Sequence, residues 1–166
     1  MKRREFLAAS ASLCAATSVQ ADNASNPFLL HTPSLVHPVV IESVELLHGN
    51  GEYVVRVRSK EGVAVANSSR LRETYPIFLR RVAPFFVDKD VRRLEGLIDE
   101  LYRNGSNYKL QGLAFWVCVA AIEMAILDLL GKASNQSIGE MFGGIRRREI
   151  AVYRASGNRP SETSNY

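Results

Sequence analysis

The chain has 166 residues, 46% of them hydrophobic and 23% charged, which is enough for about one domain but too short for a (β/α) barrel of about 250 residues. Of its 21 basic and 17 acidic residues, Lys2, Arg3, Arg4 and Glu5 lie in the first 21 positions, which leaves a net charge of +2 for the remainder. We therefore expect no nucleic-acid binding and no electrostatic attachment to a membrane surface.

Residues 1–21 have the pattern of a secretory signal peptide. A basic start precedes an apolar run over 6–19 that is too short to span a bilayer, and Ala21 provides the small residue that signal peptidase requires. The pair Arg3–Arg4, followed by Glu5–Phe6–Leu7, is similar to the twin-arginine export motif. We expect an exported, periplasmic protein with no membrane contact after signal removal. The alternative is a basic and apolar N-terminus that arose by chance.

Residues 22–67 change from a polar segment to strands. Residues 22–38 contain three prolines and are predicted to be a linker. Three strands are predicted over 39–47, 53–58 and 63–66, because β-branched and apolar residues alternate there and Asn50–Gly51 is a strong hairpin signal. The result is a small antiparallel meander.

Two helices are predicted next. The first covers 70–87 and is expected to be interrupted by Pro76 and Pro84. The second covers 91–103, where apolar residues recur at helical spacing and Asp90 is placed to cap the start.

The stretch 111–133 is predicted to be a central core helix. It holds ten consecutive apolar residues from Leu113 to Ile122 and no proline. A helix that is apolar on nearly every side is expected to be buried on nearly every side. It is long enough to span a bilayer, but Glu123 and Asp128 would each cost about 2.5–3.5 kcal/mol near the centre of a spanning helix. These acids favour a soluble domain.

A short helical turn over 137–142 and a strand over 149–153 complete the predicted elements. The segments Glu123–Met124–Ala125, Asp128–Ala133 and Gly143–Gly144, followed by a basic residue and that strand, resemble the end of the N-terminal domain in the mandelate racemase/muconate lactonizing enzyme group of the enolase superfamily. The resemblance covers about residues 39–159.

This resemblance implies an α+β fold in which a three-stranded antiparallel meander is followed by a helical bundle. Residues 39–145 would form the N-terminal capping domain. Residues 146–166 would begin the barrel domain and contribute only its first strand. The chain is then expected to be the front part of an enzyme, ending inside its barrel.

In the resembled family a divalent metal, usually Mg²⁺, and a Lys or His base remove the proton next to a substrate carboxylate. The family's metal ligands, an Asp and two Glu, stand at the ends of successive barrel strands. After Tyr153 only 13 residues remain, Glu162 is their only acid, and no Lys or His follows Lys132. We expect no catalytic residue and no metal ligand in this chain, and no Mg²⁺ bound to it.

Two loops of the cap are implied to approach the substrate. The family's loop between the first two strands closes over the active site, and here that loop is unusually short. The second loop follows the third strand. The candidates in these loops are His48, Gly49, Asn50, Gly51, Glu52, Asn67 and Ser68. For His48 the alternative is an ordinary exposed turn histidine.

Three more candidates, Arg154, Ser156 and Asn158, follow the expected barrel strand, whose C-terminal end would face the active site. Their alternative is an unstructured tail. Glu123 and Asp128 lie about 140° apart around a helix, so they do not converge on one site. Each is expected to have a structural role, bonding backbone or an arginine where cap and barrel meet.

Two functions from different classes remain open. The first is the capping and specificity domain of an exported, metal-dependent dehydratase, racemase or cycloisomerase that acts on a small carboxylate such as a sugar acid. The second is a non-catalytic exported α+β domain that binds a partner or oligomerises. A homo-oligomer is compatible with either function.

Overall fold

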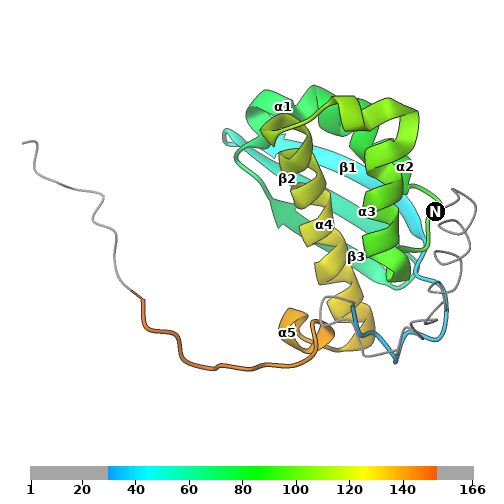
Figure 1. Cartoon of the computed structure of the whole chain (residues 1–166), viewed down its shortest axis with the longest axis vertical. Coiled ribbons are helices and arrows are strands. Elements are labelled where there is room, and N and C mark those ends of the chain that lie inside the picture. The colour runs from blue at the N-terminus through cyan, green and yellow to red at the C-terminus, as the bar shows by residue number, and fades with distance from the viewer. Residues whose placement is uncertain (1–29, 153–166) are drawn as a thin grey trace, which may run out of the picture.

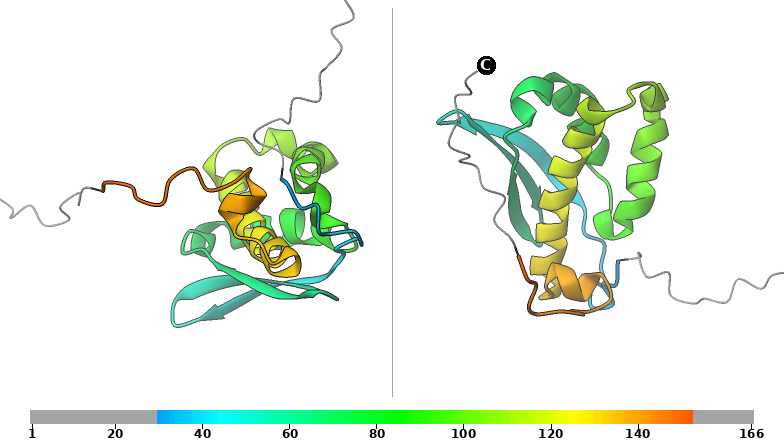
Figure 2. Two further views of the ribbon diagram at one scale, coloured as in Figure 1. Left: turned by 90° about the horizontal axis from the view of Figure 1, so that it is seen from below. Right: turned by 60° about the vertical axis from the view of Figure 1, so that its left-hand side comes forward.

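The structure is a computed structural model, and it describes residues 30–152. In chain order the elements are β1 (Ile41–Gly49), β2 (Glu52–Ser59), β3 (Gly62–Asn67), α1 (Leu71–Ile77), the π-helical turn η1 (Phe78–Val82), α2 (Ala83–Phe86), the 3₁₀ turn η2 (Val91–Arg93), α3 (Leu94–Arg103), the 3₁₀ segment η3 (Asn104–Lys109), α4 (Leu113–Ser134) and α5 (Ile138–Met141). The sheet forms one layer and the helices gather on one side of it (Figures 1 and 2). The predicted α+β fold, a meander followed by helices, is confirmed.

The three strands form an antiparallel sheet in the order β1-β2-β3. Their side chains alternate between two faces. Val55, Val57 and Ala64 are buried on the inner face, while Glu45 and Arg56 form an ion pair on the outer face. The sheet therefore has one face for the core and one face for solvent.

Helix α4 crosses the inner face of the sheet and forms the centre of the core (Figure 1). Phe115, Ile122, Ile126, Leu129 and Leu130 have no exposed surface. Within residues 30–152, α4 is the one helix long and apolar enough to cross a bilayer, and more than half of its most apolar window is buried inside the domain. That burial is typical of a core helix.

One side of α4 differs from the prediction that the helix is buried nearly all round. Leu113 is 68% exposed, Met124 51% and Trp116 42%. The sheet and the other helices of residues 30–152 cover most of α4 but leave this side open. This side of α4 is therefore apolar in sequence but exposed to solvent within the described residues.

The helical run after β3 is continuous despite its two prolines. Pro76 lies inside α1, and Pro84 is the second residue of α2, directly after the π-helical turn η1. The π-helical turn between them is closed by the amide of Ala83, which bonds the carbonyl of Phe78. The prolines therefore do not break the helical run as expected. The run contains a π-helical turn, which is a local widening of the helix.

Asp90 caps the second predicted helix, as the sequence indicated. Its carboxylate accepts hydrogen bonds from the amides of Val39 (3.1 Å) and Arg92 (3.2 Å) and from the guanidinium of Arg92. The first turn, η2, is 3₁₀, and α3 follows it. This cap also ties the start of the sheet to the start of α3.

The described part of the predicted linker lies against the domain. The amide of His31 donates to the carbonyl of Met141 (2.7 Å), and the amide of Leu30 donates to the Glu95 carboxylate (3.1 Å). Arg92 donates to the carbonyls of Leu35 and Val36, both at 3.0 Å. Residues 30–38 thus make specific contacts with the folded domain.

After α5 the chain leaves the domain. Ser137 and Glu140 form the capping box of α5, and Gly143 and Gly144 have φ angles of 89° and 103° that favour glycine. The strand predicted over 149–153 is not formed: residues 149–152 belong to no ladder, and Tyr153 lies outside the described residues. A barrel strand takes its hydrogen bonds from parallel neighbours, and the described residues supply none.

Candidate functional site

The structure brings the two predicted cap loops together at one end of the sheet. The turn between β1 and β2 lies beside the loop that follows β3. The side-chain amide Nδ2 of Asn67 donates to Oε2 of Glu52 (2.7 Å), and the backbone amide of Ser68 donates to the carbonyl of Tyr53 (3.0 Å). These bonds make the two loops one continuous edge, which we call the cap edge (residues 48–52 and 67–70).

The turn in the cap edge is a two-residue hairpin. Gly49 pairs with Glu52, and Asn50 and Gly51 have φ angles of 53° and 79°. Positive φ at both central residues matches the strand twist and defines a type I′ turn. The Arg72 guanidinium donates to the carbonyl of Gly51 (2.9 Å). The turn is therefore short and held from α1, which suits a fixed wall better than a moving lid.

Aromatic rings support the cap edge on the core side. The ring centroids of His48 and Tyr53 are 4.4 Å apart, and Tyr53 stacks on Tyr75 of α1 at 6.0 Å with an interplanar angle of 11°. The predicted candidate His48 is thus the outer member of a row of three rings, tilted by 37° against Tyr53. The imidazole of His48 therefore packs against the ring of Tyr53.

Sequence reasoning missed Tyr53, Arg72 and Tyr75. The position of Tyr53 opposite His48 was readable, because a two-residue turn fixes that register. Arg72 and Tyr75 reach the turn only because α1 folds back beside it, and no local pattern signals that contact.

Two hollows flank the cap edge. One, of about 530 Å³, lies against the turn and is lined by Leu47, His48, Gly49, Asn50, Glu52 and Val54. The other, of about 350 Å³, lies between α1 and the start of α4 and is lined by Ser69, Arg70, Glu73, Thr74, Leu113, Ala114 and Val117. Both hollows mix apolar and polar groups, as a contact surface for a polar small molecule does.

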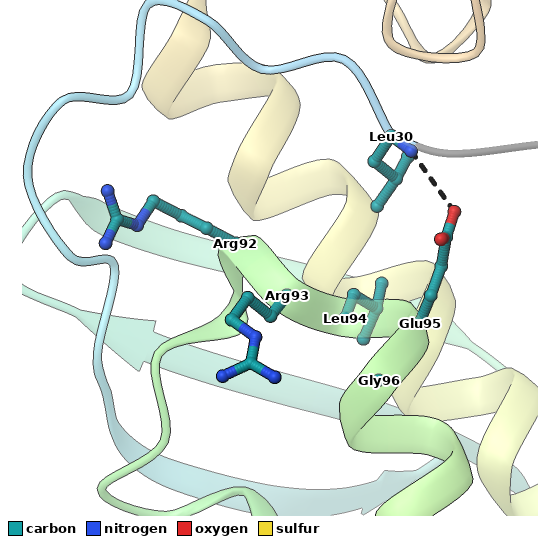
Figure 3. A pocket seen from close by; sticks show the side chains of 6 residues that line it. All are labelled: Leu30, Arg92, Arg93, Leu94, Glu95 and Gly96. Carbon is teal, nitrogen blue, oxygen red and sulfur yellow. Dashed lines mark hydrogen bonds between the residues drawn. The ribbon is translucent and has the colours of Figure 1, made fainter. Parts of the chain in front are cut away.

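A third hollow, of about 300 Å³, lies at the start of α3 and is shown in Figure 3. The guanidinium groups of Arg92 and Arg93 point in different directions, and the Glu95 carboxylate is bonded to the amide of Leu30. Arg92 is also bonded to Asp90. These side chains do not converge on a common point, so this hollow is not a candidate site.

The acidic residues of the described domain do not fit a divalent metal. Residues 30–152 contain no group of three or more His, Cys, Asp or Glu side chains placed to hold one ion. Asp128 pairs with Lys132 (2.6 Å), rather than with backbone or an arginine as expected. Glu123 is half-buried, and burial raises the pKa of its carboxyl. No hydrogen bond or ion pair reaches that carboxyl from the described residues.

The remaining candidates, Arg154, Ser156 and Asn158, lie outside the described residues. Their expected place at the end of a barrel strand stays a prediction.

Known proteins resemble this chain in sequence and in fold. A D-galactonate dehydratase from Xanthomonas axonopodis pv. citri is 29% identical over 121 residues, which are 72% of this chain and 28% of that protein. A D-galactonate dehydratase family member from Pseudarthrobacter chlorophenolicus is 31% identical over 103 residues, 60% of this chain and 25% of that protein. The match thus spans about a quarter of the length of these relatives.

A solved structure also resembles this chain in fold. The crystal structure of a protein described as a racemase, from Roseobacter denitrificans, superposes with a TM-score of 0.56 at 25% identity, over 64% of this chain and 29% of that one. The family model for the mandelate racemase/muconate lactonizing enzyme N-terminal domain matches residues 27–143. This match covers the sheet, the helices and the cap edge, and the chain therefore belongs to the mandelate racemase/muconate lactonizing enzyme N-terminal domain family.

Proposed function

We propose that this chain is the substrate-capping domain of a metal-dependent enolase-superfamily enzyme that acts on a small carboxylate such as a sugar acid. The observation that supports it most is the cap edge, where the two loops expected to approach substrate are joined by the Asn67–Glu52 hydrogen bond. Matched relatives described as D-galactonate dehydratases make dehydration of a sugar acid the first reaction to test. Racemisation and cycloisomerisation are the alternatives within the family.

In this proposal the cap edge contacts the hydroxyl-bearing end of the substrate. His48, Glu52 and Asn67 offer hydrogen-bonding groups at one end of the sheet. Their positions are held by the type I′ turn, by Arg72 and by the stack of rings. A preorganised wall favours one substrate shape because it need not be ordered on binding.

We assign proton abstraction to the catalytic barrel that the family resemblance implies beyond the matched segment. Mg²⁺ would stabilise the enolate-like anion there. The acids of residues 30–152 do not fit that ion, so the chain alone has no assigned chemical step. Arg154, Ser156 and Asn158 are proposed to face the substrate only when that barrel is complete.

A chimera tests the capping role. Residues 30–144 replace the matched segment of the Xanthomonas dehydratase, and Mg²⁺-dependent dehydration of D-galactonate is measured. We expect turnover by the folded chimera, with a KM that rises on Asn67→Ala and stays unchanged on Lys60→Ala, which alters an exposed residue just beyond the opposite end of β2. A folded chimera without turnover, or with equal effects of both substitutions, contradicts the proposal.

Export is a separate proposal. It is supported by the basic start, the apolar run and the Arg3–Arg4 pair, and residues 1–21 lie outside the described part of the chain. Fused to a reporter that folds before transport, residues 1–21 should direct it to the periplasm. Replacing both arginines with lysine should retain the reporter in the cytoplasm.

A second function, that of a non-catalytic interaction domain, is favoured by one observation. The open side of α4 exposes Leu113, Trp116 and Met124, and contiguous exposed apolar surface marks interaction sites.

A further inference from the structure

Residues 30–38 lie across the end of the domain where α4 finishes (Figure 1), and we call them the strap. They belong to no helix or strand, and none of them is fully buried. Leu30 and Leu35 pack against the core as partly buried side chains. A segment with so few buried contacts opens at a lower free energy than the whole domain unfolds. The strap is therefore a unit that can open by itself.

The strap binds the ends of two helices. Ser134 and Met141 are the last residues of α4 and α5, and carbonyls at a helix end have no partner within the helix. The hydroxyl of Ser34 donates to the carbonyl of Ser134 (3.4 Å), and the amide of His31 donates to the carbonyl of Met141 (2.7 Å). The strap thus supplies donors to both helix ends.

Helix α5 depends on contacts of this kind. It has four residues, and a helix this short is not stable by itself in water. The capping box holds its start, the buried side chain of Met141 holds it against the core, and the strap binds its last carbonyl. The chain leaves the domain directly afterwards, at Gly143 and Gly144. The contacts that order α5 therefore also fix the point at which the chain leaves.

Arg92 holds the strap from the opposite side. Its Nη1 donates to the carbonyls of Leu35 and Val36, both at 3.0 Å, while its Nε and Nη2 donate to Oδ2 of Asp90 (3.0 and 2.7 Å). One planar guanidinium thus binds a carboxylate and the strap at the same time. The next residue, Arg93, is exposed, and its guanidinium points in a different direction (Figure 3).

We propose that the strap opens and closes as a unit, that Arg92 holds it closed, and that α5 is ordered only while the strap is closed. The first turn before α3 is thereby coupled to the end of α5 through the strap. The closed strap fixes where the chain leaves the domain, and the open strap releases that point. This proposal is independent of the capping role, because it rests only on contacts within residues 30–144.

Hydrogen exchange of single amides in the full chain, followed by NMR, tests the coupling. Arg92→Ala should speed exchange at the His31 amide by at least about tenfold, because it removes charge-assisted bonds to the strap. The amides of Met141 and Phe142, which bond within α5, should accelerate by a similar factor, since α5 opens only after the strap. Arg93→Ala removes the same charge from the same turn and should leave all three amides unchanged. Circular dichroism verifies that both variants are folded.

A second variant reaches the same contact without changing Arg92 or Asp90. His31→Pro removes the N–H that donates to the carbonyl of Met141. It should speed exchange at Met141 and Phe142 as Arg92→Ala does, while amides within α3 keep their wild-type rates. The double variant should exchange no faster at α5 than either single variant, because both substitutions break one connection.

Four results would overturn the proposal. The first is a His31 amide that exchanges freely in the wild-type chain, which means that the strap is not docked. The second is fast exchange at His31 in Arg92→Ala with wild-type rates at α5, which separates the strap from α5. The third is an equal effect of Arg92→Ala and Arg93→Ala, which assigns the change to lost charge. The fourth is unchanged exchange at α5 in His31→Pro.

Discussion

Asn67 and Glu52 are 15 positions apart in sequence and are joined by a 2.7 Å hydrogen bond from Nδ2 to Oε2. The bond connects the loop after β3 to the turn between β1 and β2. These are the two segments expected to approach substrate, so this contact turns two separate loops into one surface.

Removing that contact should loosen the turn without unfolding the domain. For Asn67→Ala we expect faster amide hydrogen exchange at Gly51 and Glu52. The free energy of unfolding should change by less than about 1 kcal/mol, because the bond is exposed to solvent. Lys60→Ala, just beyond the opposite end of β2, should leave exchange at the turn unchanged. Unaltered exchange at the turn in Asn67→Ala would show that the bond does not hold the loops together.

The two glycines of the turn should respond differently to alanine. Gly51 has a φ of +79°, and an added Cβ would lie 3.2 Å from the Arg72 guanidinium. Gly51→Ala should cost about 1–2 kcal/mol of unfolding free energy, since L-residues avoid this conformation. Gly49 has no positive φ and nothing within 4 Å of an added Cβ, so Gly49→Ala should be close to neutral. Urea denaturation measures both, and equal losses would argue against the type I′ turn.

Substitutions on the buried side and on the open side of α4 should differ in their effect on the free energy of unfolding. Ile122 is fully buried, and Ile122→Ala should cost about 2–5 kcal/mol through lost burial and a cavity. Met124 is 51% exposed, so Met124→Ala should lower the free energy of unfolding by no more than about 0.5 kcal/mol. Urea denaturation of the two variants and the wild type makes the comparison. A large loss from Met124→Ala would mean that this side of α4 is covered within the monomer.

Asp90 should make stability depend on pH. Burial alone would raise the pKa of its carboxyl, but hydrogen bonds from Arg92 and from the amide of Val39 lower it below the ordinary value of 3.8. A carboxyl whose pKa is lower in the folded state stabilises the fold above its unfolded pKa, and this contribution is lost as the pH falls through the folded value. Asp90→Ala should therefore cost about 1–3 kcal/mol at neutral pH. The difference from wild type should shrink in strongly acidic solution, and a difference that is constant with pH would contradict the assignment.

Much of the fold was readable from local patterns. The Asn50–Gly51 turn fixed the hairpin and the register of His48 opposite Tyr53, and Asp90 marked the start of a helix. These signals are local because each depends on residues adjacent in sequence or across a two-residue turn.

The rest depends on contacts between distant segments. The docking of residues 30–38 rests on single bonds such as that between His31 and Met141, which are 110 positions apart. The approach of Arg72 and Tyr75 to the turn depends on where α1 folds. The open side of α4 could not be predicted, because the whole helix is apolar in sequence. Hydrophobicity alone does not distinguish residues that their own domain buries from residues that it leaves exposed.

We propose that this chain contributes the cap and not the chemistry. This proposal is tested most directly by incubating the purified chain with D-galactonate and Mg²⁺ and measuring dehydration, beside the full-length Xanthomonas relative as a positive control. We expect turnover by the relative and no turnover above the buffer rate by the chain. Mg²⁺-dependent dehydration by the chain, abolished by a chelator, would contradict it and require a catalytic site within these 166 residues.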